Sequence, residues 1–373
     1  VLLREKLDKG EMTEQQYRNK VGISKTDPIA NMKMVFSRSR YSVQTQPDIN
    51  SQVKMFQKME FVVGTSSDMS DTALTADVIL PWAEDGPEQN IGYRGILAGM
   101  MLSPKYVATP GEAKEQLWMY TKLAERLGLL SQYMPEYTTD DKWDALMEEY
   151  NKKAYEAWAG SATIKPLNPP SWEEFKKKPV FRATLDPIDI GWKAQIEQGT
   201  KFTTTSGKIQ IYDAQLTDEV YLKETSRYGG YIDPMPMYRP VVEGFDDPNR
   251  PEYPITISSS HRRYHLHHRW DRNPLLRDEV YRHSVWLSVA DAAARGIKDG
   301  DTVLISSPAG MVTAPAYVTS RMVPGCACLF EVAHSQVNQL GIDRRGSVNM
   351  LITTNRDFAG MFPYCTRVEV GKY

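Results

Sequence analysis

Cysteine and long apolar runs are both scarce in this sequence. Three of the 373 residues are cysteine, and this odd number excludes a complete set of paired disulfides. Cys326 and Cys328 stand too close in the chain for a usual zinc knuckle, so we interpret them as buried apolar thiols. No run of about 18 apolar residues occurs, and we therefore expect no direct membrane span.

A surplus of either charge is also missing. The 45 basic and 47 acidic residues leave a net charge of −2, which argues against a nucleic-acid partner. The length indicates about two or three domains, and 41% hydrophobic residues are typical of a globular protein. The chain begins at Val1 without a visible signal peptide, so we expect it to be a piece of a longer protein.

Against this neutral background, residues 257–271 (ISSSHRRYHLHHRWD) hold four of the six histidines. A strand-like run leads into this loop, and its arginines suit a phosphate or pyrophosphate group. A metal site is the rival interpretation, because His265 and His267 would share one face of a strand. The flanking arginines would repel a cation, which favours the anion. A solvated basic loop stays open as a third interpretation.

Residues 1–25 are expected to form an exposed helical hairpin broken at Gly10. Beyond it, short apolar runs alternate with helix-like segments, which predicts a parallel α/β unit. The runs are 32–37, 59–64 and 76–81, and the segments between them are 49–59 and 70–76. Ligands bind beyond the carboxyl ends of such strands, so residues 65–68 are expected on a ligand-facing edge.

Two helices and one strand are predicted in the middle of the chain. Residues 112–130 form an amphipathic pattern whose apolar side carries Leu117, Tyr120, Leu123 and Leu127. Residues 143–159 predict a second helix, and residues 208–213 predict a strand after a turn. Prolines then become frequent and place a domain boundary near residue 246.

The last part of the chain consists of short strand-like runs joined by turns. They predict an antiparallel sandwich or barrel, interrupted by one helical turn at residues 291–297. The runs are 253–259, 284–289, 302–318 and 367–371.

Six motifs in this order carry a family resemblance. They are SSDMSDTALTADVILPWAE, PGEAKEQLWMYTKLAERLGL, TTSGKIQIY, PITISSSHRRYHLHH, LSVADAAARGIKDGDTVLISSPAGMVTAPAYVTSRMVPG and GSVNMLITTNRD. The chain resembles the carboxyl-terminal half of the molybdopterin oxidoreductases of the dimethyl sulfoxide reductase family.

The resemblance implies an α/β plus all-β fold in three parts. Residues 1–125 would be the latter part of a parallel α/β dinucleotide-binding domain. Residues 126–245 would be a mixed α/β connecting region that returns to a neighbouring domain. Residues 246–373 would be a dinucleotide-binding, six-stranded β-barrel of the double-psi type.

The implied cofactor is a bis(molybdopterin guanine dinucleotide) holding molybdenum, or tungsten. The resemblance assigns fourteen positions to it: Thr65, Ser66, Gln116, Ser259, Ser260, His261, Arg262, Arg263, His265, His267, His268, Asn349, Tyr364 and Cys365. Relatives often have an Asp at the place of Gln116, and a Gln can still bond to an amide edge. The family's molybdenum ligand and iron–sulfur motif belong to the amino-terminal half, so this chain holds no predicted metal ligand or catalytic residue.

The implied function is reduction of an S- or N-oxide, or of a similar small substrate, in anaerobic respiration. An iron–sulfur electron-transfer subunit and a membrane anchor subunit are the implied partners, with the enzyme peripheral on the extracytoplasmic face of the membrane; a cytoplasmic location is the alternative. Three other functions stay open: a non-catalytic cofactor-binding or assembly module, a relative acting on another oxyanion or an aromatic hydroxyl, and a nucleotide-binding protein without molybdenum.

The basic loop is tested by the double substitution Arg262→Ala and His265→Ala in the complete protein. Both side chains are expected to contact the dinucleotide, so bound pterin and activity should fall together. Pterin is measured after release from the purified protein. An unchanged pterin content would show that the loop is only a surface feature.

Overall fold

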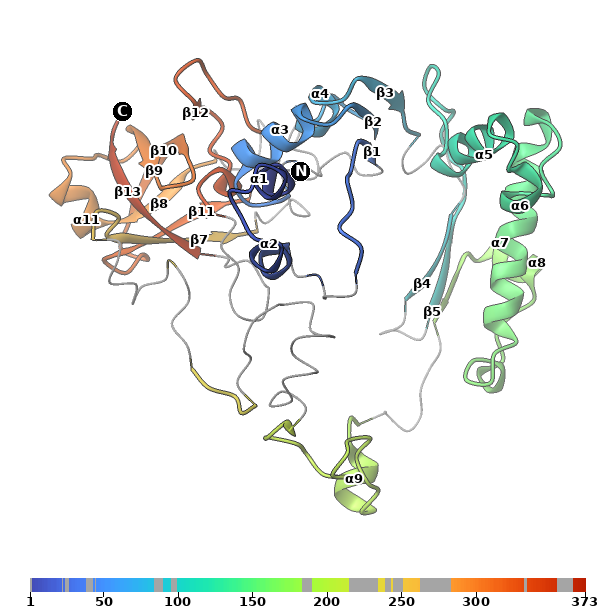
Figure 1. Ribbon diagram of the computed structural model, residues 1–373. Coiled ribbons are helices and arrows are strands. Elements are labelled where there is room, and N and C mark those ends of the chain that lie inside the picture. The colour runs from blue at the N-terminus through green and yellow to red at the C-terminus, as the bar shows by residue number, and fades with distance from the viewer. Residues whose placement is uncertain are drawn as a thin grey trace. The chain divides into compact units, whose positions relative to one another are not determined.

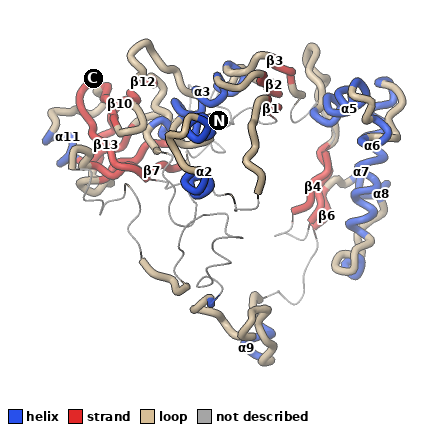
Figure 2. Tube along the Cα trace, viewed as in Figure 1, coloured by secondary structure: helices blue, strands red, loops and turns tan. Residues whose placement is uncertain are grey.

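The structure is a computed structural model that divides into two compact units (Figures 1 and 2). It describes residues 2–21, 23, 27–37, 43, 45–83, 90–94, 99–182, 190–214, 234–238, 243, 251–261, 283–331, 334–353 and 365–373. Unit 1 comprises Val1–Gly64, Met69–Ile79 and Ile209–Tyr373, and unit 2 comprises Thr65–Asp68 and Leu80–Lys208. The three-part division expected from the sequence stays a prediction.

Six strands of unit 1 form a closed barrel. They are β7 (Ile255–Ser260), β8 (Val285–Ser288), β9 (Thr302–Ser306), β10 (Met311–Thr319), β11 (Cys326–Phe330) and β13 (Cys365–Lys372). Around the barrel they follow the order β9-β10-β8-β11-β7-β13, and β13 pairs with β9 again. A two-residue strand, β12 (Ile342–Asp343), pairs in parallel with the start of β10.

The barrel contains parallel as well as antiparallel pairs. β7 pairs in parallel with β11, and β8 pairs in parallel with β10, whereas the other pairs of the ring are antiparallel. The expectation of a purely antiparallel sheet is therefore wrong, and the double-psi barrel implied by the resemblance is confirmed. Strand β11 was not predicted, because its sequence CACLF was interpreted only as apolar thiols.

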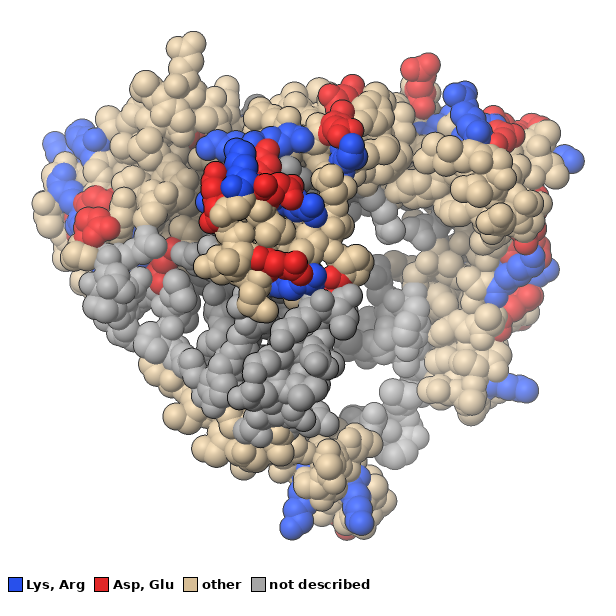
Figure 3. All heavy atoms as spheres, viewed as in Figure 1, with Lys and Arg blue, Asp and Glu red and all other residues tan. Residues whose placement is uncertain are grey.

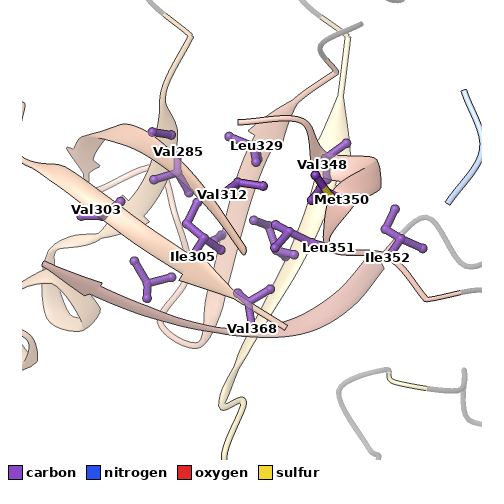
Figure 4. Close-up of a cluster of buried hydrophobic side chains, with 14 of the residues drawn as sticks. Val285, Val303, Ile305, Val312, Leu329, Val348, Met350, Leu351, Ile352 and Val368 are labelled. Carbon is purple, nitrogen blue, oxygen red and sulfur yellow. The ribbon is translucent and has the colours of Figure 1, made fainter. Parts of the chain in front are cut away.

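Alternating side chains of these strands fill the interior of the barrel. Val303 and Ile305 of β9 and Val368 and Val370 of β13 are all fully buried. Figure 4 shows such side chains converging with those of Val348, Met350, Leu351 and Ile352, which belong to the same apolar cluster. Burying a side chain of this size contributes about 1.5–3 kcal/mol. Cys326 and Cys328 point outward and are only half-buried, so the expectation of buried thiols is wrong.

A small parallel α/β sheet belongs mainly to the same unit. It consists of β1 (Met34–Ser37), β2 (Phe61–Ser66) and β3 (Val78–Pro81), with α3 (Ile49–Gln57) and α4 (Asp71–Leu74) between the strands. The carboxylate of Asp48 accepts a hydrogen bond from Ser51 N at 3.0 Å and so begins α3. The alternation of strands and helices expected from the sequence is confirmed.

The amino-terminal hairpin expected at residues 1–25 is also present. Helices α1 (Leu2–Asp8) and α2 (Glu14–Val21) are separated by Gly10, whose backbone φ is 72°. Within the barrel, α11 (Val289–Ala294) forms the predicted helical turn between β8 and β9. None of the helices among the described residues is long and apolar enough to cross a membrane.

Unit 2 combines an antiparallel sheet with several helices. Its elements are β4 (Asn90–Arg94), β5 (Gly99–Ser103), β6 (Val180–Arg182), α5 (Gln116–Arg126), α6 (Leu130–Tyr133), η2 (Asp140–Lys142), α7 (Trp143–Ala159), η3 (Lys165–Leu167), α8 (Trp172–Lys177) and α9 (Lys193–Glu197). Helix α7 has the predicted bounds. Basic and acidic side chains are interspersed on the face drawn in Figure 3, in keeping with the small net charge.

Two predictions for the middle of the chain are corrected. Helix α5 forms, but Leu123 and Leu127 of the predicted apolar side are exposed, and Met119, Thr121 and Ala124 are buried instead. Thr121 can be buried because its hydroxyl donates to Leu117 O at 2.8 Å. The predicted strand at residues 208–213 does not form. Ile209 and Ile211 are exposed there, and no described strand lies beside them to bond to their backbone.

Gly346 is constrained by both its backbone and its surroundings. Its φ is 72°, and an added Cβ would lie 2.7 Å from His283 Nε2, which itself makes a 2.9 Å hydrogen bond with Gly346 O. An L side chain in this left-handed region costs about 1–2 kcal/mol even without a clash. Both the left-handed backbone and the lack of space for a Cβ therefore favour glycine at position 346.

Gly346→Ala is expected to lower the melting temperature of the complete protein more than Gly296→Ala does. Gly296 is the matched control, because its φ is 63° but an added Cβ would meet no described atom within 4 Å. The difference between the two variants, measured by calorimetry, isolates the clash with His283. Equal decreases would show that the ring moves aside without cost.

Candidate functional site

The predicted cofactor residues fall into two groups. Eight lie among the described residues: Thr65, Ser66, Gln116, Ser259, Ser260, His261, Asn349 and Cys365. Six lie outside the described residues: Arg262, Arg263, His265, His267, His268 and Tyr364. The eight described residues are divided between the two units: Thr65, Ser66 and Gln116 belong to unit 2, and the other five belong to unit 1.

Thr65 and Gln116 of unit 2 are brought together although 51 residues separate them. The side-chain amide of Gln116 donates to Thr65 Oγ1 at 3.2 Å. Thr65 and Ser66 are both buried at the carboxyl end of β2, where a parallel sheet commonly presents its ligand-binding edge. The Ser66 hydroxyl donates to Asp68 O at 2.7 Å, and Ser66 O accepts from Trp82 N at 3.0 Å. The residues therefore form a small rigid group of hydroxyl and amide functions.

Glu115 adds a carboxylate beside Gln116 at the beginning of α5. Its Oε2 accepts a hydrogen bond from Trp143 Nε1 at 2.8 Å. Burial raises the pKa of Glu115, and the hydrogen bond from Trp143 opposes this rise in part. The sequence carries no signal for a functional role of this residue, because a Glu before a helix is an ordinary feature and its indole partner lies 28 residues away.

In unit 1, strand β7 carries predicted contacts at its carboxyl end. Ser258 and Ser260 point outward, whereas Ser259 lies on the same side as the buried Ile257. His261 is exposed, with Nε2 3.6 Å from Glu331 Oε2. Cys365 of β13 lies directly opposite Ser258, so the structure brings the start of β13 beside the end of β7.

Asn349 lies in η6 (Val348–Met350), a short turn held by the buried carboxylate of Asp343. One carboxylate oxygen accepts from Gln336 N at 2.6 Å and Arg345 N at 3.1 Å. The other accepts from Ser347 N, the residue before the turn, at 2.7 Å. Burial raises the pKa of Asp343, and the negative charge of Asp71 raises it further against the opposing effect of these hydrogen bonds.

Asp71 provides a second connection to the segment that follows the barrel strand β11. Its Oδ2 accepts from Ser335 N at 2.8 Å and from Ser335 Oγ at 2.6 Å. Its Oδ1 lies 3.7 Å from Nδ1 of the buried His334. Asp71, His334 and Asp343 were not selected from the sequence. Their only signal was polarity, and 264 residues separate Asp71 from Ser335.

The described donors fit a polar organic cofactor. A pterin dinucleotide offers ring edges with mixed donors and acceptors, which hydroxyl and amide side chains can match. Thr65, Ser66, Gln116, Ser260 and Asn349 are of this kind. The buried hydroxyl of Ser347, next to η6, has no hydrogen-bond partner among the described residues. Within the same residues, no three or more His, Cys, Asp or Glu side chains are grouped as a metal site.

Asp77 satisfies a backbone donor of the neighbouring strand β2. Its carboxylate accepts a hydrogen bond at 2.7 Å from Val62 N, in the strand β2 that carries Thr65 near its end. Ser70 is the N-cap of α4 and accepts from Ala73 N at 3.2 Å. These two residues therefore support the strand and the helix on either side of the predicted contacts.

Two family models match the chain. The model described as "Molybdopterin oxidoreductase" matches residues 6–126, and the model described as "Molydopterin dinucleotide binding domain" matches residues 255–366. The second match coincides with the barrel from the first residue of β7 to the second residue of β13. The two matches thus cover the parallel α/β part and the barrel separately.

Curated relatives and a solved structure agree with these matches. The chain is 31% identical to dimethyl sulfoxide reductase DmsA of Escherichia coli K12, over 79% of the chain and 35% of that protein. It is 28% identical to a trimethylamine-N-oxide reductase of Haemophilus influenzae, over 87% of the chain and 40% of the relative. Acetylene hydratase from Pelobacter acetylenicus has the same fold over 94% of this chain and 45% of that one, with a TM-score of 0.67 and 18% identity.

These matches have one limit in common: the chain spans less than half the length of each of these relatives. Within that span, both family models fall on the parts that the structure shows as a parallel α/β unit and a closed double-psi barrel. The chain belongs to the molybdopterin oxidoreductases of the dimethyl sulfoxide reductase family and includes their molybdopterin dinucleotide-binding domain.

Proposed function

We propose that the complete protein containing this chain reduces an S-oxide or an N-oxide with a molybdenum bis(molybdopterin guanine dinucleotide) cofactor. One observation carries the proposal: the closed barrel coincides with the dinucleotide-binding domain model. The choice of substrate class is supported by the relatives, whose names state dimethyl sulfoxide and trimethylamine N-oxide reduction. Such a reduction consumes two electrons and two protons for each oxide and releases water.

When bound, the cofactor supplies the metal that exchanges electrons and an oxygen atom with the substrate. The residues of this chain bind and orient it. We assign Thr65, Ser66 and Gln116 to one dinucleotide contact, because the Gln116 amide bonds to the Thr65 hydroxyl and Ser66 is the next residue at the same strand end. We assign Ser259, Ser260, His261, Asn349 and Cys365 to contacts of the barrel domain, on the resemblance and on their positions at strand ends and in η6.

The proposal extends to partners and location. An iron–sulfur subunit would deliver electrons, and an anchor subunit would hold the enzyme at the extracytoplasmic face of the membrane. The metal ligand and an iron–sulfur cluster would come from a part of the complete protein that this chain does not include. Respiration with an external oxide as electron acceptor is the role that these parts would serve together.

Metal and nucleotide analysis of the purified complete protein tests the proposal. Molybdenum or tungsten is expected by mass spectrometry, with guanine nucleotide released on acid treatment, and reduced viologen should be oxidised when dimethyl sulfoxide or trimethylamine N-oxide is added. Metal and nucleotide without oxide reduction would favour another oxyanion or an aromatic hydroxyl as substrate. A protein without both would refute the proposed cofactor and leave the assembly or nucleotide-binding alternatives.

The contact at Thr65 is tested by Thr65→Val, which keeps the side-chain shape but removes the hydroxyl that accepts from Gln116. Loss of one hydrogen bond of this kind is expected to lower retained nucleotide by about twofold to tenfold. Thr121→Val is the matched control, because Thr121 is equally buried and its hydroxyl donates only within α5. Equal nucleotide contents in the two variants would remove Thr65 from the site.

A further inference from the structure

Glu243 is a buried carboxylate that no sequence motif indicated. Glu243 is 1% exposed. Its backbone φ of 62° lies in the left-handed region, which is uncommon for a residue with a side chain of this size. Non-glycine residues in this region cost about 1–3 kcal/mol and persist where the surroundings hold them firmly. The contacts of the Glu243 side chain show what holds it.

Each carboxylate oxygen of Glu243 accepts a hydrogen bond from a different threonine. Thr353 Oγ1 donates to Oε1 at 2.6 Å, and Thr366 Oγ1 donates to Oε2 at 2.9 Å. Hydroxyl bonds to a carboxylate are stronger than bonds between neutral groups. One side chain therefore connects two segments that lie 110 and 123 residues further along the chain.

Both threonines stand next to proposed cofactor contacts. Thr353 follows η6, which carries Asn349, and the segment between them is anchored where Ser307 Oγ donates to Leu351 O at 2.7 Å. Thr366 is the second residue of β13, directly after Cys365. It is completely buried opposite Ile257 of β7, so its hydroxyl would lie among apolar side chains without the carboxylate.

Cys365 also experiences the charge of Glu243. Burial raises the pKa of the Cys365 thiol, and the negative charge of Glu243 raises it further. Cys328 offers an internal comparison. It lies on the other side of β7, opposite the same Ser258, and burial alone raises the pKa of its thiol.

We propose that Glu243 is a positioning residue of the cofactor site: its carboxylate joins Thr353 to Thr366 and thereby sets the positions of Asn349 and Cys365. The bridge explains why a carboxylate is buried beside the barrel strands in a left-handed conformation. The negative charge of Glu243 also adds to the effect of burial in opposing ionisation of the Cys365 thiol, and a neutral thiol suits a contact to a polar ring or to a phosphate better than a thiolate would. This inference rests on the proposed function for the identity of the ligand.

The substitutions Glu243→Gln and Glu243→Ala separate the bridge from its charge. Gln keeps two hydrogen-bonding atoms, and the threonine hydroxyls can rotate to donate or accept. We expect Glu243→Gln to retain guanine nucleotide within about twofold of the unchanged protein, and Glu243→Ala to lose on the order of threefold or more. Nucleotide is measured after release from the purified complete protein.

Thiol alkylation provides a readout that does not depend on activity. Removing the charge in Glu243→Gln should lower the pKa of Cys365 and raise its alkylation rate near pH 8 by about twofold to fivefold. The rate at Cys328 should stay unchanged, because Glu243 does not contribute to its shift. Rates at the two cysteines are separated by peptide mass spectrometry across a pH series.

Each outcome has a definite meaning. Nucleotide retained in Glu243→Ala at the unchanged level would overturn the positioning role. An unchanged rate at Cys365, or an equal rise at Cys328, would overturn the electrostatic contact and indicate general loosening instead. Absence of nucleotide from the unchanged protein would refute the proposed function, whereas the alkylation rates would still test the contact between Glu243 and Cys365.

Discussion

The pairing of β9 with both β10 and β13 closes the barrel, and the arrangement of unit 1 depends on this closure. Strand β10 makes it possible because its first half pairs with β9 and its second half pairs with β8. A closed sheet has no unpaired edge and encloses one apolar core. The closure also places the end of β7 beside the start of β13, which brings the two sets of predicted barrel contacts to adjacent positions.

Among the described residues, three buried carboxylates fix the positions of segments that the apolar core alone does not fix. Asp71 binds Ser335, Asp343 holds the backbone before η6, and Glu243 joins Thr353 to Thr366. Hydrophobic packing has no direction, whereas a carboxylate accepts hydrogen bonds only from donors at defined positions. Burial of the charge opposes folding, and each of the three is accordingly surrounded by backbone or hydroxyl donors. These contacts therefore fix irregular segments that strands and helices leave undetermined.

Much of the fold was predictable from local patterns, and the exceptions have physical causes. The bounds of α7 and the alternation of β1, β2 and β3 with α3 and α4 follow from apolar periodicity, which reports burial on one or two faces. Residues 208–213 alternate like a strand but have no neighbouring strand among the residues that the structure describes, and alternation alone cannot supply one. The buried face of α5 was predicted wrongly, because a row of leucines on one face of a helix does not show which face packs against the rest of the unit. Strand β11 was not predicted, because its small and sulfur-containing side chains do not form a clear strand pattern.

For the candidate site, the sequence by itself determined the chemical character: hydroxyl, amide and basic side chains at the ends of predicted strands, in an order that identified the family. Only the tertiary structure decided which of them lie together, such as Thr65 with Gln116 and Cys365 with the end of β7. It also revealed Asp343 and Glu243, whose partners are backbone groups and threonines far along the chain. A side chain's chemistry is a local property that a sequence displays, whereas hydrogen bonding between distant segments exists only in the folded chain.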